Sequence, residues 1–292
     1  MANTILTPDI IAREALMTLR NNTVMSSLVY RDYSGEFTKV GDTITIRKPA
    51  TFQAKEFTTE IEVQDAVESG VQVVMDKHLD VSFAVTAKQK TLDIADFSRQ
   101  LLTPAMQAFA QKIDTYLVAL GETVTHVVTR GAEAAIKDLA QCGKDLNSRA
   151  VPNGNRYMVL SPAAYADYVI LPPILNAEKS GSTDALRSAS MGKILGFETY
   201  MDQNVTTKNL AFHKNAFALV TRPLELPEGG VKASTVTYDG FGLRVVMDYD
   251  IQKKMDVVSI DMLCGVAMLD ERLACRLDDA ASGGGGSSTT TK

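Results

Sequence analysis

Apolar residues recur every three or four positions from Leu92 to Leu120, which is the longest helical pattern of the chain. Pro104 interrupts this pattern, so either the helix kinks there or a new helix begins with Thr103 as its cap and Pro104 at its first position. We favour the new start, which predicts a rod of roughly 27 Å. Asp114 falls outside the apolar face, whose members are Ile94, Phe97, Leu101, Ala105, Phe109, Ile113, Tyr116 and Leu120.

The N-terminal pattern predicts a shorter helix followed by an arm. Thr7 is a suitable cap, Pro8 suits the first helical position, and Asp9 complements the positive end of the helix. The following residues 21–37 have no regular period and predict a partly extended arm that packs against another part of the structure. The face expected to be buried in the helix consists of Ile10, Ala15, Leu16 and Leu19.

Alternating polar and apolar residues predict strands on both sides of an irregular excursion. One strand covers residues 41–46, and alternation resumes at residues 71–85. Between them, residues 49–70 have mixed charge and no apolar stripe, so we expect an extended, hairpin-like excursion. Its aromatic residues suggest contact with a neighbouring subunit, although a solvated loop with locally packed rings is the alternative. The candidate interface residues are Phe52, Lys55, Phe57 and Glu60.

The remainder of the chain alternates helices and strands before becoming rich in strands. Residues 132–146 predict a helix, 157–160 a buried strand, and Ser161-Pro162 the start of another helix. Residues 171–190 suit a surface loop, and strands follow at 192–200 and 209–221. Asp239-Gly240 between two apolar runs is the strongest hairpin signal. Residues 255–260 and 262–269 predict further strands, and the Gly/Ser/Thr-rich ending behaves as coil.

Composition narrows the possible functions. The 292 residues are 45% hydrophobic and 22% charged, which is typical of a globular protein with a substantial core. We expect no signal peptide and no membrane span, because the longest apolar runs are too short. The net charge of -5 disfavours tight binding of nucleic acid, although an acidic protein can still enclose it. Three separated cysteines indicate buried thiols in a reducing compartment.

The chemistry-bearing residues form no recognisable reaction centre. His78, His126 and His213 have neither catalytic nor metal-ligand spacing. No phosphate-binding loop is present, and Ser161 and Cys142 lack the sequence context of a nucleophile. The acidic residues Asp248, Asp250, Asp256 and Asp261 alternate with apolar ones, so we expect an outer sheet face there. The sequence therefore predicts a protein without catalytic activity, cofactor or metal. A bond between Lys55 and an asparagine of a neighbour is a remote possibility beside a solvated lysine.

Several stretches resemble the major capsid proteins of tailed double-stranded DNA bacteriophages. NTILTPDIIAREALMTLRNN, LVYRDYSGEF and GDTITIRKPATF are similar to the coat-protein family of short-tailed enteric phages. YDGFGLRVVMDYD and KMDVVSIDMLCGVAMLDERLACRL are similar to the closing strands of that family. The resemblance extends from about Ala2 to Leu277 and rests on sustained order more than on a single motif. The large inserted domain of the short-tailed relatives has no room here.

The resemblance implies an α+β protein with the Hong Kong ninety-seven type capsid fold. It implies that the subunit self-assembles as pentamers and hexamers into an icosahedral shell, with scaffolding and portal proteins, in the host cytoplasm. The shell is part of the virion and encloses double-stranded DNA. A nanocompartment shell of the same fold that holds protein cargo is the alternative, and an unrecognised enzyme or a DNA-binding protein are more distant ones. The implied domains are an N-terminal arm (1–40), the extended loop with its flanking strands (41–90), the spine helix and peripheral domain (91–131), most of the axial domain (132–220), closing strands of the peripheral domain (221–278) and a flexible tail (279–292).

Overall fold

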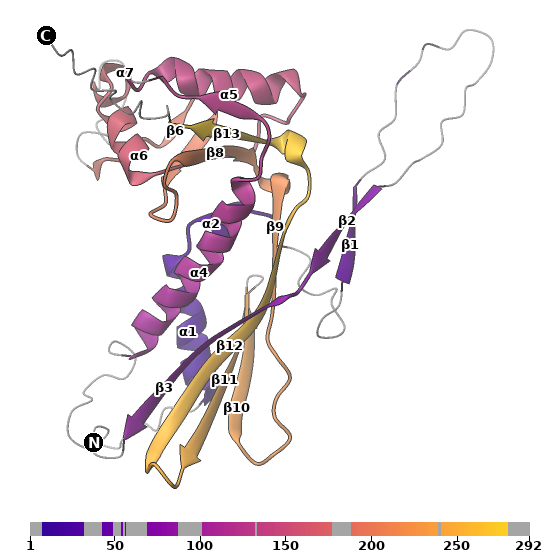
Figure 1. The fold of residues 1–292 in the computed structure, drawn as a ribbon, viewed down its shortest axis with the longest axis vertical. Helices are drawn as coiled ribbons and strands as arrows, with labels where there is room; N and C mark the ends of the chain where they lie inside the picture. The colour runs from indigo at the N-terminus through magenta and orange to yellow at the C-terminus, as the bar shows by residue number, and fades with distance from the viewer. Residues whose placement is uncertain are drawn as a thin grey trace, which may run out of the picture. The chain divides into compact units, whose positions relative to one another are not determined.

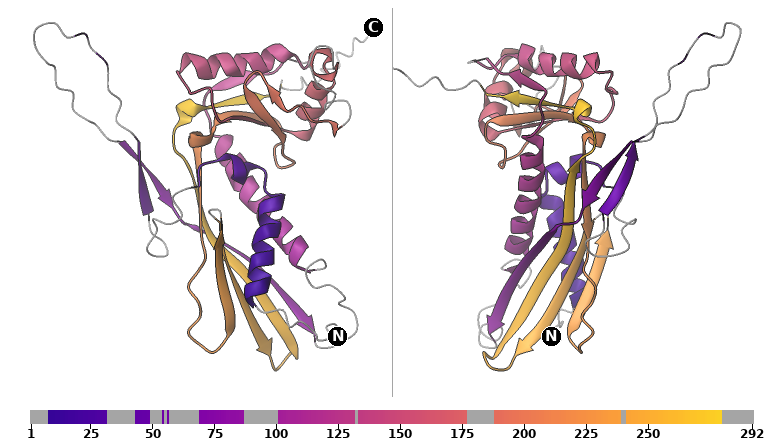
Figure 2. Two further views of the ribbon diagram at one scale, coloured as in Figure 1. Left: turned by 180° about the vertical axis from the view of Figure 1, so that it is seen from behind. Right: turned by 45° about the vertical axis from the view of Figure 1, so that its right-hand side comes forward.

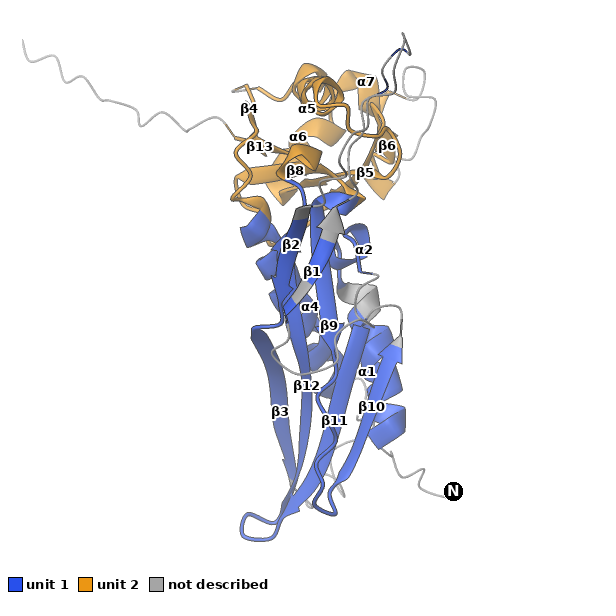
Figure 3. Cartoon of the chain, turned by 90° about the vertical axis from the view of Figure 1, so that its right-hand side faces the viewer, with its two compact units in different colours: residues 1–120, 215–270 blue, residues 121–214, 271–292 orange. Residues whose placement is uncertain are grey.

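The chain folds into two compact units, each built from more than one stretch of sequence. The computed structural model describes residues 8–31, 43–48, 54, 56, 69–86, 101–131, 133–176, 188–238 and 241–279. Unit 1 contains residues 1–120 and 215–270, and unit 2 contains residues 121–214 and 271–292 (Figure 3). The chain therefore leaves unit 1 after residue 120, returns to it at residue 215, and leaves it again after residue 270 to end in unit 2.

Unit 1 is built on an antiparallel sheet with the order β10-β11-β12-β3, and β9 pairs with the second half of β12 (Figure 1). The register pairs Tyr238 with Phe241, so β10 and β11 form the predicted hairpin, and the two connecting residues lie outside the described part of the chain. The two strands predicted at 255–269 are one continuous strand. The strands are β3 (Lys77–Thr86), β9 (Phe217–Arg222), β10 (Lys232–Tyr238), β11 (Phe241–Asp250) and β12 (Met255–Met268).

The two faces of this sheet differ in polarity, as alternation along the strands requires. Leu79, Leu243 and Ile260 share the apolar face, and α1 (Pro8–Asn22) packs against β10 and β11. Figure 2 shows α1 and α4 (Thr103–Gly121) on the same side of the sheet. The opposite face carries polar residues such as Asp80 and Ser259.

Helix α1 begins at Pro8 as predicted, and three of the four positions expected in its buried face are buried. Ile11, Ala12, Ala15, Leu16 and Leu19 are buried. Ile10, expected in the core, is 41% exposed, so that prediction is wrong. The reason is helical geometry: at about 100° per residue, Ile10 lies on the opposite side of the helix from Leu19, which is buried.

Helix α4 begins at Thr103, and helical backbone at residues 101–102 leads directly into it, so the new start at Thr103 as against a kink at Pro104 stays a prediction. Ala105, Phe109 and Ile113 are buried, as expected. The buried face is wider than predicted and includes Asp114, which is only 2% exposed. The expectation that Asp114 lies away from the packed face is therefore wrong. Further buried positions on α4 are Met106, Ala110, Leu117 and Val118.

Asp114 is buried because it holds the segment that follows α1. Its carboxylate accepts the backbone N–H of Val24 at 2.9 Å and of Ser26 at 3.2 Å, at the start of the short helix α2 (Met25–Leu28). Tyr30 then pairs with β9, donating its N–H to Phe217 O and accepting from Leu219 N. The described part of the predicted arm thus packs within unit 1.

Strands β1 (Thr43–Lys48) and β2 (Ser69–Val74) form a separate antiparallel ribbon in unit 1 (Figure 1). Gly265 of β12 lies beside the end of β2, where an added Cβ would meet Val74 O at 2.5 Å. Only glycine allows the two backbones to approach so closely. The predicted excursion begins and ends at this ribbon, and its residues 49–53, 55 and 57–68 lie outside the described residues.

Unit 2 contains a mixed six-stranded sheet with the order β4-β13-β8-β5-β7-β6. Helix α5 (Ile136–Ser148) packs against β13 and β4, and α6 (Pro162–Val169) against β5. Ser161 Oγ accepts the N–H of Ala164 at 3.2 Å, which confirms the predicted cap of α6. The short helix α7 (Pro172–Leu175) follows. The strands are β4 (Val127–Thr129), β5 (Arg156–Leu160), β6 (Lys193–Ile194), β7 (Phe197–Met201), β8 (Lys208–His213) and β13 (Ala274–Asp278).

The last strand belongs to this second sheet. β13 pairs with β8 in antiparallel and with β4 in parallel orientation, and the 3-10 turn η3 (Glu271–Leu273) precedes it. A second 3-10 turn, η2 (Lys214–Ala216), separates β8 of unit 2 from β9 of unit 1. Residues 221–278, interpreted from the sequence as one set of closing strands, are therefore divided between the two units.

Candidate assembly surfaces

The four interface residues predicted from the sequence are not brought together by described structure. Phe52, Lys55, Phe57 and Glu60 lie outside the described residues, so their role stays a prediction. Two residues between them, Ala54 and Glu56, are described and exposed. The structure instead defines the base from which this excursion begins.

The base of the β1–β2 ribbon is fixed by an apolar cluster. Side chains from both strands and from the residue after β2 pack on β9 and on the end of β12. Burying one such aliphatic side chain contributes about 1.5–3 kcal/mol, so the ribbon has an anchor of its own in unit 1. The buried members of this cluster are Ile46, Val73, Met75, Ala218, Val220 and Leu269.

Large apolar side chains are exposed in two connecting segments and at one strand end of unit 1. Leu226 is 49% exposed in the segment between β9 and β10, and Ile251 is 78% exposed in the turn between β11 and β12. Tyr249, at the end of β11, is 48% exposed. The register places the start of β10, the end of β11 and the start of β12 at the same end of the sheet. Tyr249 and Ile251 lie at this end, whereas the residue before Leu226 is bound by Arg244 in the middle of β11. Neighbouring exposed apolar groups are typical of protein interfaces.

A buried ion pair lies on the polar face of the same sheet. Asp261 is 4% exposed. Arg244 Nε donates a hydrogen bond to Asp261 Oδ1 at 2.9 Å, and Arg244 Nη2 donates one to Asp261 Oδ2. The remaining Arg244 nitrogen, Nη1, donates to Glu225 O at 2.5 Å, and His78 Nε2 lies 3.5 Å from the carboxylate. Arg244 therefore links the sheet to the segment that carries Leu226.

The expected outer face of acidic residues is only partly correct. Asp261 is covered by its ion pair, because Arg244 lies directly opposite it in the register. Asp256 pairs with Tyr249 and lies on the opposite face from Asp248, since successive side chains alternate between faces. The sequence pattern could not show which of these acidic residues share a face, because it does not reveal which strands are neighbours in the sheet.

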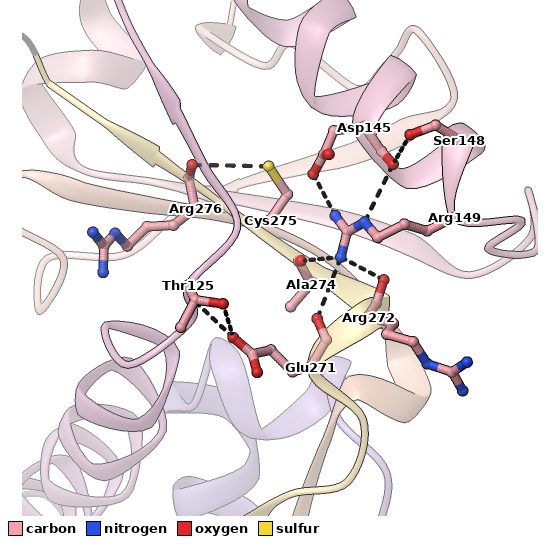
Figure 4. Close-up of polar contacts among 9 residues, drawn as sticks. All are labelled: Thr125, Asp145, Ser148, Arg149, Glu271, Arg272, Ala274, Cys275 and Arg276. Carbon is pink, nitrogen blue, oxygen red and sulfur yellow. Dashed lines mark hydrogen bonds and ion pairs between the residues drawn. The ribbon is translucent and has the colours of Figure 1, made fainter.

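In unit 2 the polar contacts join α5 to the segment before β13 (Figure 4). Arg149 Nη1 donates to the carbonyl oxygens of Arg272 at 2.6 Å and Ala274 at 3.0 Å, with Glu271 O at 3.4 Å. Arg149 Nη2 also pairs with the Asp145 carboxylate. Each of these contacts joins groups of the protein to one another, so the cluster holds the backbone in place.

Thr125 and Glu271 form a second contact in the same region. The backbone N–H of Thr125 donates to Glu271 Oε1 at 2.8 Å, and the Thr125 hydroxyl donates to the same oxygen (Figure 4). These hydrogen bonds lower the pKa of Glu271, because they stabilise its charged form. The Glu271 carboxylate therefore has a structural role, in which it holds Thr125.

The other titratable groups named from the sequence are placed as structural residues. The carboxylate of Asp261 lies beside His78, and burial, followed by repulsion from Arg156, lowers the pKa of His213. Cys142, Cys264 and Cys275 are free and buried, as predicted, and burial raises the pKa of Cys264 to about 12. Among the described residues, no group of three or more His, Cys, Asp or Glu side chains could hold a metal ion. Within the same part of the chain, no helix is long and apolar enough to cross a membrane.

Comparisons with solved structures identify the fold. A chain from Mycobacterium phage Che8 has a TM-score of 0.67 at 17% identity, covering 87% of this chain and 90% of that one. The capsid of cyanophage P-SCSP1u gives 0.62 at 14% identity, with 88% of each chain covered. The mature capsid of bacteriophage PhiM1 gives 0.56 at 11% identity, covering 90% of this chain and 87% of that one. The chain has the phage capsid fold.

This fold, of the Hong Kong ninety-seven type, confirms the predicted α+β class. A virus-like particle from Pyrococcus furiosus is also similar, with a TM-score of 0.53 at 10% identity, covering 92% of this chain and 98% of that one. No protein-family model matches the sequence, and no curated protein is significantly similar to it. At these identities the similarity concerns the fold.

Proposed function

We propose that this chain is a major capsid protein that self-assembles into an icosahedral phage head enclosing double-stranded DNA. The observation that carries the proposal is the extent of the structural similarity. About nine-tenths of this chain and of two phage capsid chains superpose at TM-scores of 0.62 and 0.56. Exposed apolar residues of unit 1 such as Tyr249 and Ile251 support a subunit that makes contacts with other copies.

In this proposal unit 1 is the peripheral domain and unit 2 is the axial domain. Helix α4 is the spine helix, and residues 49–68 form the extended loop between β1 and β2. Phe52, Lys55, Phe57 and Glu60 of this loop contact a neighbouring subunit. The anchored base of the ribbon supports this arrangement, because a fixed base would direct the loop toward a partner.

More specifically, the chain is a relative of the coat proteins of short-tailed enteric phages. The support is the resemblance of the sequence stretches near both ends of the chain to that family. Pentamers and hexamers of the subunit assemble in the host cytoplasm with scaffolding and portal proteins and become part of the virion. The subunit has a structural role and catalyses no reaction. Its net charge of -5 suits a shell that encloses DNA without binding particular sequences.

A second candidate is a nanocompartment shell that holds protein cargo. The similarity to the virus-like particle from Pyrococcus furiosus favours it, because this chain covers 98% of that one. The phage capsids superpose with higher TM-scores, so the phage head is the preferred assignment.

The test is negative-stain electron microscopy of the purified chain, alone and after co-expression with a neighbouring scaffold gene. Closed shells, tubes or partial shells are expected. Small discrete particles under both conditions would contradict the proposal. The contents separate the two candidates, since nuclease-protected double-stranded DNA indicates a phage head and a co-purifying enzyme indicates a nanocompartment.

The extended loop can be tested separately by removing residues 55–65. The subunit should remain folded by circular dichroism but assemble poorly, because the loop contributes to neighbours more than to its own core. The paired substitution Phe52→Ser with Phe57→Ser should have the same effect. Normal shells from the deletion would contradict the interface role of the loop.

A further inference from the structure

Two segments of unit 1, one between β9 and β10 and the other between β11 and β12, carry exposed apolar side chains and charges of opposite sign. The acidic segment, defined as residues 225–228, contains Glu225, Leu226 and Glu228. The basic turn, defined as residues 251–254, contains Ile251 and two lysines. All residues of both segments are exposed. Leu226 and Ile251 keep 49% and 78% of their surface exposed, so neither covers the other in the isolated chain.

The basic turn is held in one conformation by its own polar groups. Asp250 Oδ1 accepts the N–H of Gln252 at 2.9 Å and of Lys253 at 3.1 Å, and Lys253 Nζ lies 3.9 Å from Asp250 Oδ2. Lys254 has a φ of 52°, in the left-handed region that side-chain-bearing residues rarely adopt. The turn therefore presents Ile251 to solvent from an ordered backbone.

The acidic segment is held from the opposite side, by the buried ion pair. Arg244 donates to Glu225 O while its other nitrogens are bound by Asp261, which is itself buried. The contact uses the backbone of Glu225 and leaves its side chain for another partner. Binding that requires little ordering of a loop loses less entropy, so both segments are prepared for contact.

We propose that the basic turn of one copy docks on the acidic segment of a second copy of this chain. Lys253 and Lys254 face Glu225 and Glu228 across this contact, and Ile251 packs against Leu226. The inference rests on the proposed function, because it specifies one contact between subunits of the shell. Arg244 and Asp261 are positioning residues for the acidic segment.

A second copy is the partner that the chain's own chemistry favours. Each copy carries both halves of the contact, which is the requirement for a heterologous interface that repeats from subunit to subunit. Complementary charge around an apolar centre is typical of specific protein contacts. Asp250 lies directly before the turn and pairs with Lys253, and Asp248 lies farther back on β11. Lys254 therefore adds a positive charge that Asp250 does not balance.

The experiment is a charge-reversal cycle on the full chain. One variant combines Lys253→Glu with Lys254→Glu, a second combines Glu225→Lys with Glu228→Lys, and a third carries all four substitutions. Assembly is measured by light scattering and electron microscopy over a concentration series. A control with Lys137→Glu and Lys144→Glu makes the same charge change on exposed residues of α5. Circular dichroism melting shows whether each variant is folded.

Each two-residue reversal should raise the concentration needed for assembly about tenfold, and the four-residue variant should recover most of the loss. The α5 control should assemble like the wild type. If the wild type assembles but a reversal has no effect, or the combined variant does not recover, the docking contact is wrong and the shell function stands. If the wild type never assembles, the proposed function fails and the docking contact fails with it.

Discussion

One polar contact in each unit joins distant segments, and the two contacts use side chains of opposite charge. In unit 1, the buried carboxylate of Asp114 accepts backbone N–H groups at the start of α2. In unit 2, Arg149, which follows α5, donates to the backbone carbonyls of Arg272 and Ala274. A carboxylate can only accept hydrogen bonds and a guanidinium can only donate them, so the first contact binds amide N–H groups and the second binds carbonyl oxygens.

The sheets differ in a related way. β3 of unit 1 alternates between buried and exposed residues, whereas β8 of unit 2 is buried at five of its six positions. A sheet with one polar face leaves that face and its end loops for other contacts. The difference teaches that β8, a central strand of its sheet, lies in the interior of unit 2, while β3 keeps one polar face exposed.

A packing substitution sets the scale for this comparison. Phe109→Ala removes a side chain of α4 that is 2% exposed, and it should lower the free energy of unfolding by about 3–5 kcal/mol. Denaturant unfolding followed by circular dichroism measures the change. Met17→Ala on α1, at a position that is 68% exposed, is the control and should cost less than about 0.5 kcal/mol. Equal effects would show that the face of α4 has been assigned wrongly.

Arg149→Met tests the donor side of the comparison and should cost about 2–3 kcal/mol. The substitution leaves three carbonyls without their charged donor, although its aliphatic stem keeps similar volume. Arg272→Met makes the same chemical change at a neighbouring exposed side chain and should have little effect. Denaturant unfolding of the two variants gives the comparison directly. A loss as large for Arg272→Met would mean that charge alone, and not the three-carbonyl contact, stabilises unit 2.

Local signals predicted much of this fold. The start of α1 at Pro8, the cap at Ser161 and the hairpin between β10 and β11 each depend on neighbours in sequence, so composition and spacing suffice. The burial of Asp114 depends on amides about 90 residues away. Its helical neighbours Ala110 and Val118 are both apolar, and this spacing was the only available signal.

The candidate surface was less accessible from the sequence. Ile251 and Leu226 are ordinary apolar residues in the chain, and only the structure shows that both are exposed. Arg244 and Asp261 are 17 positions apart, and their pairing follows from strand order. The four residues predicted on the excursion come from composition alone and remain a prediction.

Asp114→Ala tests the acceptor side of the comparison and should cost about 1–2 kcal/mol, because the first amides of α2 lose their acceptor. Asp114→Asn retains one side-chain oxygen and should recover part of this loss. Hydrogen exchange of Val24 and Ser26 should accelerate in the alanine variant. Unchanged exchange at these amides would show that the carboxylate does not hold them in solution.

The smallest expected effect concerns His213, which lies in unit 2 beside a positive charge. Burial, followed by repulsion from Arg156, lowers the pKa of His213 below its ordinary value of 6.5. The unfolded chain therefore binds a proton at higher pH than the folded chain. The stabilising effect is complete above about pH 6.5 and is lost as the pH falls through the folded pKa. His213→Phe keeps an apolar ring and removes the titration, so its free energy of unfolding should fall less than that of the wild type between about pH 7.5 and pH 5. Denaturant unfolding at both values measures the difference, and parallel pH profiles for the two proteins would show that His213 is not held neutral beside Arg156.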